Sequence, residues 1–255
     1  MIRIAAAGDV HFGEDSAGTL QPHLARLADE ADVLVLAGDL TRCGSAREAA
    51  VLAKELDGLP LPVFAVLGNH DYHADQNDGI TNVLVESGVR VLEGDAEVVT
   101  VGGTRVGVAG IKGFGGGFAG ACGSDFGEPE MKAFIRHTKD RADALERALS
   151  TLEGDVRIAL MHYSPIRDTL QGEPPEIFPF LGSYLLAEAV DRAGADLVVH
   201  GHAHRGREHG VTPGGINVRN VAQTVIRQAY AVYEFDARAG AGRRMASTGA
   251  SSSTG

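Results

Sequence analysis

Short apolar runs that each end in a glycine recur through the first part of the chain. They read IRIAAAG, DVLVLAG and LPVFAVLG and cover residues 2–8, 32–38 and 61–68. Stretches with apolar residues at helical spacing lie between them, at residues 20–31 and 45–58. Unbroken apolar runs are typical of parallel strands buried on both faces, and right-handed crossovers join such strands through helices. The pattern predicts βαβ units and a largely parallel sheet.

The pattern changes in the middle of the chain. Residues 96–111 form two runs around Gly102 and Gly103, which predicts a β-hairpin. The glycine-rich stretch at 113–127 lacks the Gly-Lys-Ser/Thr ending of a nucleotide-binding loop, and we expect a flexible connection there in preference to a lid over a site. The later elements predicted are a helix within about 129–150, a strand at 156–162, a helix at 181–194, a strand at 195–204, and antiparallel strands within 207–222 and 229–236.

The composition fits one domain. The chain has 255 residues, of which 44% are hydrophobic, and no apolar run reaches the roughly 18 residues of a membrane span. We interpret residues 1–236 as a single domain and residues 237–255, which lack core-forming side chains, as a disordered tail. The N-terminal apolar run is too short for a secretory signal and is expected to be a first strand. The two cysteines, Cys43 and Cys122, form no disulfide framework, so we expect a reducing, cytoplasmic location.

The net charge limits the partners of the protein. Its formal value is −11, from 34 acidic and 23 basic residues. Strong binding to a nucleic-acid backbone needs a basic surface, so we expect none, and we expect no membrane partner. A small phosphate ester remains compatible with this charge, because bound metal ions can dominate the potential of a single site.

Polar side chains follow five of the apolar runs, at the point where each run ends. Ligands of open α/β sheets bind beyond the carboxyl ends of parallel strands, so we expect these side chains to converge. Two of the runs end in pairs of polar residues spaced two apart, and extended backbone projects such pairs to the same side. The side chains concerned are Asp9, His11, Asp39, Asn69, His70, His162, His202 and His204.

These residue types suit metal ions bound by oxygen and nitrogen. The set holds carboxylates, an amide and imidazoles without sulfur, which suits Mn, Fe, Zn, Ni or Co, and it is large enough for two ions. Two divalent ions carry +4 and two carboxylates with a hydroxide carry −3, so the remainder of +1 favours an anionic ester. Taken singly, Asp9 and Asp39 also suit helix caps, Asn69 a turn, and His162 a buried core position.

Five short motifs occur in a fixed order along residues 1–235. They read GDVH, GDL, GNHD, MHYSP and HGHAH, at 8–11, 38–40, 68–71, 161–165 and 200–204. In this order they resemble the motifs of the calcineurin-like metallophosphoesterases. The resemblance implies a four-layer αββα sandwich with two mixed sheets, and a centre of two divalent or mixed-valence metal ions.

The resemblance also implies a role for each residue. Asn69 would hold phosphoryl oxygens together with the metal ions, and a hydroxide that bridges the ions would attack phosphorus. His70 matches the position of the family's histidine that binds no metal and protonates the leaving oxygen. The implied ligands are Asp9, His11 and His204 for the first ion, Asn69, His162 and His202 for the second, and Asp39 for both.

Several residues near the motifs receive supporting or open roles. Asp71 would orient His70 or stabilise its turn, and His200 would lie in the core or behind the ligands, because alternation points it away from His202. His73 is expected near the site without binding a metal. Arg42, Lys112 and Arg205 are candidates for phosphate contacts, with a solvated surface position as the alternative.

The motifs narrow the branch of the family only in part. GDLTRCG has Arg42 where Ser/Thr protein phosphatases have a second aspartate, and GNHD replaces their GNHE. The short, acidic chain argues against the DNA-repair nucleases. The sequence resembles small bacterial-type phosphohydrolases near the cyclic-nucleotide phosphodiesterases, so we expect a phosphodiesterase of small substrates, nucleotides included. The alternatives are a phosphomonoesterase, a non-catalytic binding scaffold and a metal-dependent nuclease.

Overall fold

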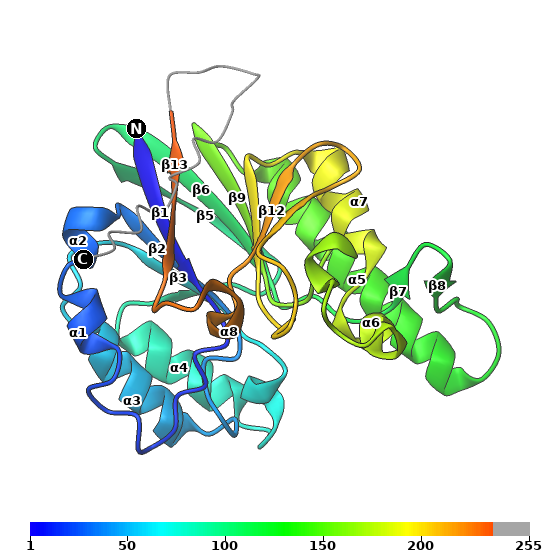
Figure 1. The fold of residues 1–255 in the computed structure, drawn as a ribbon, viewed down its shortest axis with the longest axis horizontal. Helices are drawn as coiled ribbons and strands as arrows, with labels where there is room; N and C mark the ends of the chain where they lie inside the picture. Colours follow the sequence, from blue (N-terminus) through cyan, green and yellow to red (C-terminus); the bar gives the residue numbers. More distant parts are fainter. Residues whose placement is uncertain (237–255) are drawn as a thin grey trace, which may run out of the picture.

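Two β-sheets lie face to face between two groups of helices in the computed structural model, which describes residues 1–236 (Figure 1). The strands are β1 (Ile2–Ala7), β2 (Val33–Ala37), β3 (Val63–Val66), β4 (Arg90–Val91), β5 (Asp95–Val101), β6 (Thr104–Ile111), β7 (Gly117–Phe118), β8 (Ala121–Cys122), β9 (Val156–Met161), β10 (Leu197–His200), β11 (His209–Val211), β12 (Asn217–Asn220) and β13 (Ala231–Phe235). The helices are α1 (Gln21–Leu24), α2 (Leu27–Glu30), α3 (Ala46–Leu56), α4 (Asn77–Glu86), α5 (Pro129–Thr151), α6 (Phe178–Leu181), α7 (Tyr184–Ala193) and α8 (Gln223–Ile226), with the 3₁₀ turns η1 (His70–Tyr72), η2 (Asp168–Leu170) and η3 (Pro175–Ile177).

Each sheet mixes parallel and antiparallel neighbours. The first has the order β13-β1-β2-β3-β4 and the second β11-β12-β10-β9-β6-β5. Strands β1, β2, β3 and β4 pair in parallel, and β13 joins the edge of β1 antiparallel. In the second sheet β6, β9, β10 and β12 pair in parallel, while β5 and β11 are antiparallel edges.

Alternate residues of the central strands pack into different cores, because successive side chains of a strand point to opposite faces. In β1, Ile4 packs between the two sheets, whereas Ala5 packs beneath the helices α1 to α4. In β9, Ile158 packs between the sheets and Ala159 packs against α5 and α7. The result is the predicted four-layer αββα sandwich, with α1 to α4 on one side and α5 and α7 on the other (Figure 1).

Helix α3 begins at a reciprocal cap that also fixes the loop after β2. The Ser45 hydroxyl accepts from the Glu48 backbone N–H (3.3 Å), and the Glu48 carboxylate accepts from the Ser45 backbone N–H (3.2 Å). The same carboxylate accepts from the backbone N–H of Cys43 at 2.9 Å. A cap of this kind satisfies N–H groups that a helix leaves unpaired, and here it also holds the chain that leads from β2 into the helix.

Most of the predicted elements are confirmed, and four predictions are wrong in detail. The helix predicted at 20–31 is split into α1 and α2 by an exposed turn at Ala25 and Arg26, although Leu24 and Leu27 both remain buried. The strand predicted at 195–204 ends at His200, because the chain turns at Gly201. Strand β12 pairs antiparallel with β11, as predicted, but it also pairs parallel with β10, which was not predicted.

The fourth correction concerns the glycine-rich stretch. Residues 115–118 are buried, and residues 117–122 form the small hairpin β7-β8, so this part of the stretch is packed in place. This close packing requires glycine, because a side chain on Gly115 or Gly117 would collide with neighbouring backbone.

Helix α4 was not predicted at all. Its apolar residues Ile80, Val83 and Leu84 have helical spacing, but Asn77, Asp78 and Gly79 before them read as a turn. The predicted tail at 237–255 lies outside the described residues. Among the helices described, none is both long enough and apolar enough to cross a bilayer.

Candidate metal centre

Five chain segments that leave the carboxyl ends of strands meet at one place. Three follow β1, β2 and β3 of the first sheet, and two follow β9 and β10 of the second. Backbone hydrogen bonds join them, with Asp9 N–H donating to Gly38 O at 2.9 Å and Gly201 N–H donating to His162 O at 3.2 Å. The convergence expected from the strand ends is confirmed, and it draws on both sheets.

The backbone here is strained in a way that the spacing of the polar residues does not predict. Asp9, His11, Asp39 and His202 have φ values of 56°, 44°, 51° and 69°, in the left-handed region that residues with a Cβ seldom adopt. The prediction that extended backbone would project Asp9 and His11 to the same side is therefore wrong in its geometry, although both side chains reach the site. Strain of this kind persists where the surroundings fix it, and it concentrates at functional sites.

Two glycines allow the carboxylates to approach the neighbouring chain. A Cβ built on Gly68 would collide with the carboxylate and backbone N of Asp39, and one on Gly201 would collide with the carboxylate of Asp9. The GNHD and GHAH motifs thus need these glycines, because no space remains at the site for a side chain. A side chain at either position would displace a carboxylate.

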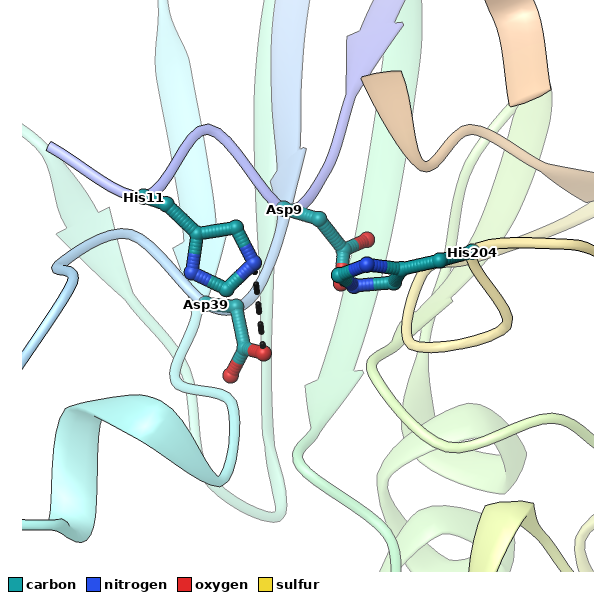
Figure 2. A group of neighbouring side chains, drawn as sticks. All are labelled: Asp9, His11, Asp39 and His204. Atoms are coloured by element: carbon teal, nitrogen blue, oxygen red, sulfur yellow. Dashed lines mark hydrogen bonds and ion pairs between the residues drawn. The ribbon is translucent and has the colours of Figure 1, made fainter. Parts of the chain in front are cut away.

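The first group of donor atoms comes from Asp9, His11, Asp39 and His204. One ligand atom from each lies within 4.8 Å of the others. Figure 2 shows the four side chains turned toward one another from three separate loops. His204 Nε2 is 2.9 Å from Asp9 Oδ1, and His11 Nε2 is 3.9 Å from Asp39 Oδ2.

The second group comes from Asp39, His162 and His202, whose ligand atoms also lie within 4.8 Å of one another. Asn69 belongs beside them, since its Oδ1 is 2.9 Å from His162 Nε2. His162 Nε2 is in turn 3.3 Å from Asp39 Oδ1. Asp39 is common to both groups and lies between them.

In the second group, hydrogen bonds fix which nitrogen of each histidine is free. His162 Nδ1–H donates to the Ala37 carbonyl at 2.8 Å, because a carbonyl can only accept, and this leaves the lone pair of Nε2 facing the group. His202 Nε2–H donates likewise to the Phe180 carbonyl at 3.3 Å, and this leaves the lone pair of Nδ1 as the possible ligand. Burial lowers the pKa of His162 to about 3, which keeps the ring in the neutral form that binds metals.

Burial also acts on the carboxylate of the first group. It raises the pKa of Asp9 to about 6, against the hydrogen bond from His204, which lowers that pKa. A carboxylate held in this position gains from a nearby positive charge. Carboxylate oxygen and imidazole nitrogen donors without thiolate, in two groups that share one carboxylate, fit a pair of divalent metal ions.

His70 lies beside the groups and belongs to neither of those formed by the described residues. Its Nδ1–H donates to the Arg42 carbonyl at 2.9 Å, and its Nε2 is 4.0 Å from Asp39 Oδ2. Its side chain is 45% exposed, whereas that of Asp39 is 1% exposed. The ring therefore lies on the open, solvent-facing side of the site, with Nε2 directed toward Asp39.

Asp71 and His200 lie behind the donor groups. Asp71 is fully buried and accepts from the backbone N–H groups of Leu40 (3.1 Å), Thr41 (2.8 Å) and Gly68 (2.7 Å), and from the Thr41 hydroxyl (2.7 Å). His200 is fully buried as well, with Nδ1–H donating to Gly201 O at 2.7 Å and Nε2 at 2.9 Å from the Thr169 hydroxyl. Asp71 thus joins the loops after β2 and β3.

Asp71→Asn is expected to lower the free energy of unfolding by about 3 kcal/mol, because an amide group replaces one acceptor oxygen that faces buried N–H and O–H donors. Urea denaturation measures the change. Asp78→Asn, on the exposed first turn of α4, is the matched control and should cost less than about 1 kcal/mol. Equal losses in the two variants would contradict the role given to Asp71.

The sequence pattern does not predict the position of every neighbour of the site. Lys112, for which a solvated position was an alternative, is only 9% exposed. The Tyr163 ring lies 4.5 Å from the His202 ring, and its position directly after His162 was the available signal. The contact of Phe180 with His202 is made by a backbone carbonyl, which no side-chain pattern reveals.

Comparison with known proteins agrees with this geometry. The profile described as calcineurin-like phosphoesterase matches residues 2–206, which include the whole donor set. The chain belongs to the calcineurin-like phosphoesterases. A protein described as an uncharacterized metallophosphoesterase, from Aquifex aeolicus (strain VF5), is 38% identical over 101 residues. That match spans 37% of this phosphoesterase and 37% of the relative's own length.

Solved structures share the fold of this calcineurin-like phosphoesterase. The phosphopantetheinyl hydrolase PptH from Mycobacterium tuberculosis is 19% identical, with a TM-score of 0.64 over 88% of this chain and 90% of that one. The protein TT1561 of Thermus thermophilus is 21% identical, with a TM-score of 0.55 over the same shares of the two chains, 88% and 90%. At these identities the likeness establishes the fold, and the fold class expected from the sequence is confirmed.

Proposed function

We propose that the protein is a metal-dependent hydrolase of phosphoric esters that prefers small phosphodiesters, with nucleotides among its substrates. The observation that carries the proposal is the pair of donor groups that share Asp39, with His70 beside them on the open side. Two ions of Mn, Fe, Zn, Ni or Co held there would polarise the phosphoryl group and activate a water nucleophile.

The donor groups divide between the two ions. Asn69 has a second task. Its Oδ1 faces His162 and the second group, and no hydrogen bond within residues 1–236 engages its amide hydrogens, which can therefore donate to a phosphoryl oxygen. The proposed ligands are Asp9, His11 and His204 for the first ion, Asn69, His162 and His202 for the second, and Asp39 for both.

His70 is proposed as the general acid. Its Nδ1–H is directed to the Arg42 carbonyl, and this hydrogen bond supports the protonated ring as well as the neutral one. A proton on Nε2 then points toward the donor groups, where the leaving oxygen of a bound ester would depart. Asp39 also accepts from the His70 backbone N–H at 2.8 Å, which ties the acid to the donor groups.

Turnover of p-nitrophenyl phosphate and bis-p-nitrophenyl phosphate, each with added Mn²⁺, tests the ester class. The proposal expects a higher kcat/KM for the diester. A higher value for the monoester would favour a phosphomonoesterase. Degradation of single-stranded DNA with a steep salt dependence would favour a nuclease instead.

Metal removal tests the centre directly. Chelation followed by dialysis is expected to abolish hydrolysis and lower the melting temperature, because ions that bind only the folded chain stabilise it, and added Mn²⁺ should restore both. Elemental analysis of the untreated protein should find two ions per chain. If the untreated protein contains no metal and added Mn²⁺ produces no hydrolysis, the result would favour a non-catalytic scaffold.

The proposed compartment is the cytoplasm. Cys43 and Cys122 are both free and exposed, which suits a reducing environment. The expected partner is a small phosphate ester, because the overall charge of −11 disfavours long polyanions.

A further inference from the structure

The ammonium group of Lys112 lies among three aromatic rings. Its Nζ is 4.3 Å from the ring centroid of Tyr72, 5.4 Å from that of Phe114 and 6.0 Å from that of Tyr163. The residue is only 9% exposed. Such rings attract a cation through their faces, but they offer it no negative charge to neutralise it.

No acceptor completes this arrangement within residues 1–236, where no hydrogen bond or ion pair reaches Lys112 Nζ. The neighbouring carboxylate, Glu93, is engaged elsewhere. Its Oε2 accepts from the Lys112 backbone N–H at 2.9 Å, and its Oε1 accepts from Arg141 Nη1 at 3.2 Å. A largely buried ammonium without an acceptor is costly unless an anion joins it.

Lys112 stands at the edge of the second donor group. Its carbonyl accepts from the backbone N–H groups of His162 and Tyr163, both at 3.1 Å. Of the three rings, that of Tyr163 lies 4.5 Å from the His202 ring, and Tyr72 follows His70 by two residues. The Tyr163 ring therefore links the ammonium to His202, a proposed ligand of the second ion, and Tyr72 belongs to the same 3₁₀ turn as His70.

We propose that Lys112 binds an anionic oxygen of the substrate beyond those that the metal ions hold. The proposal rests on the function proposed above and adds a specificity determinant to it. A lysine binds phosphate or carboxylate oxygens as a point charge, and the rings around Lys112 hold that charge in place without cancelling it. The oxygen comes either from the scissile phosphoryl group of a monoester or from a second acidic group of the substrate.

The test compares Lys112→Met and Lys112→Gln with the wild type on three substrates. Bis-p-nitrophenyl phosphate carries one charge, and p-nitrophenyl phosphate adds an anionic oxygen at the scissile phosphorus. Thymidine 3′-phosphate 5′-(p-nitrophenyl phosphate) keeps a diester at the scissile phosphorus and adds a second phosphate. Both variants are expected to raise KM at least about tenfold for one of the last two, with less than about a threefold change for the first. The substrate whose KM rises more identifies the source of the oxygen.

Controls separate binding from folding. Lys54→Met removes an exposed lysine of α3 and should change no KM, and metal content and melting temperature establish that each variant is folded and loaded. Equal losses on all three substrates would mean that Lys112 only supports the packing of the rings. Unchanged KM values on all three would likewise overturn the proposal.

A binding measurement keeps this proposal separate from the proposed function. Inorganic phosphate and pyrophosphate are titrated into the Mn²⁺-loaded proteins, and the rise in melting temperature is recorded. At least one anion is expected to stabilise the wild type and to lose most of that effect in both Lys112 variants. If the wild type hydrolyses no ester, the proposed function fails while this titration still decides the role of Lys112. Equal stabilisation of wild type and variants would overturn that role.

Discussion

Replacing His70 with alanine is expected to lower kcat by about 10²–10⁴-fold while the protein keeps its metal ions. The ring lies beside the two donor groups and belongs to neither, with Nε2 at 4.0 Å from Asp39 Oδ2 and Nδ1–H held by the Arg42 carbonyl. Loss of the ring would remove the proposed proton donor and leave the proposed ligands of both ions in place. Steady-state kinetics and elemental analysis on the same preparation measure the two effects.

The leaving group provides the sharper form of this experiment. p-Nitrophenolate departs without much help from an acid, whereas an alkoxide needs a proton, so His70→Ala should impair an alkyl ester far more than a nitrophenyl ester. His73→Ala, which removes an exposed histidine from the same turn, is the matched control and should remain near wild type. An equal loss on both esters would assign His70 a role other than proton donation.

Replacing Asp39 with asparagine is expected to weaken the binding of both metal ions by at least about 100-fold and to remove most turnover. Asp39 is the residue shared by the two donor groups, with Oδ1 at 3.3 Å from His162 Nε2 and Oδ2 at 3.9 Å from His11 Nε2. The amide keeps the size of the side chain and removes its charge. Titration of the metal-free protein with Mn²⁺ measures the change.

Two further variants serve as comparisons for Asp39→Asn. Asp57→Asn alters an exposed aspartate at the end of α3 and should bind metal like the wild type. His204→Ala removes a residue found only in the first group, so it should weaken one ion more than the other. If Asp39→Asn also weakened only one ion, the carboxylate would not be shared.

The strand ends were predictable because a run of apolar residues that stops at a polar one marks both the strand and its edge. Asp9, Asp39 and Asn69 were located in this way, and the motif order assigned His162 and His204 to the same centre. The local backbone was not predictable. The left-handed φ of His202 occurs where its backbone N–H donates to the Asp9 carboxylate at 3.0 Å, a contact between residues far apart in sequence.

Helix α4 and the surroundings of Lys112 were not predicted, and the two cases share a cause. Helix α4 begins with residues typical of turns, and only the burial of Ile80 and Leu84 against the sheet stabilises it as a helix. Lys112 ends up among aromatic rings because Tyr72 follows β3 in the first sheet and Tyr163 follows β9 in the second. Contacts between distant segments decide both cases, and no local pattern records them.

The donor groups take their residues from both sheets, and this ties the chemistry to the way the sheets are stacked. Asp39 follows β2 in one sheet, and His162 follows β9 in the other. A shift of one sheet over the other, through the apolar layer that contains Ile4 and Ile158, would change the distance between these side chains. Bound ions would hold the two sheets in a fixed relative position across that layer. A substitution deep in the shared core should therefore alter metal affinity without touching a ligand.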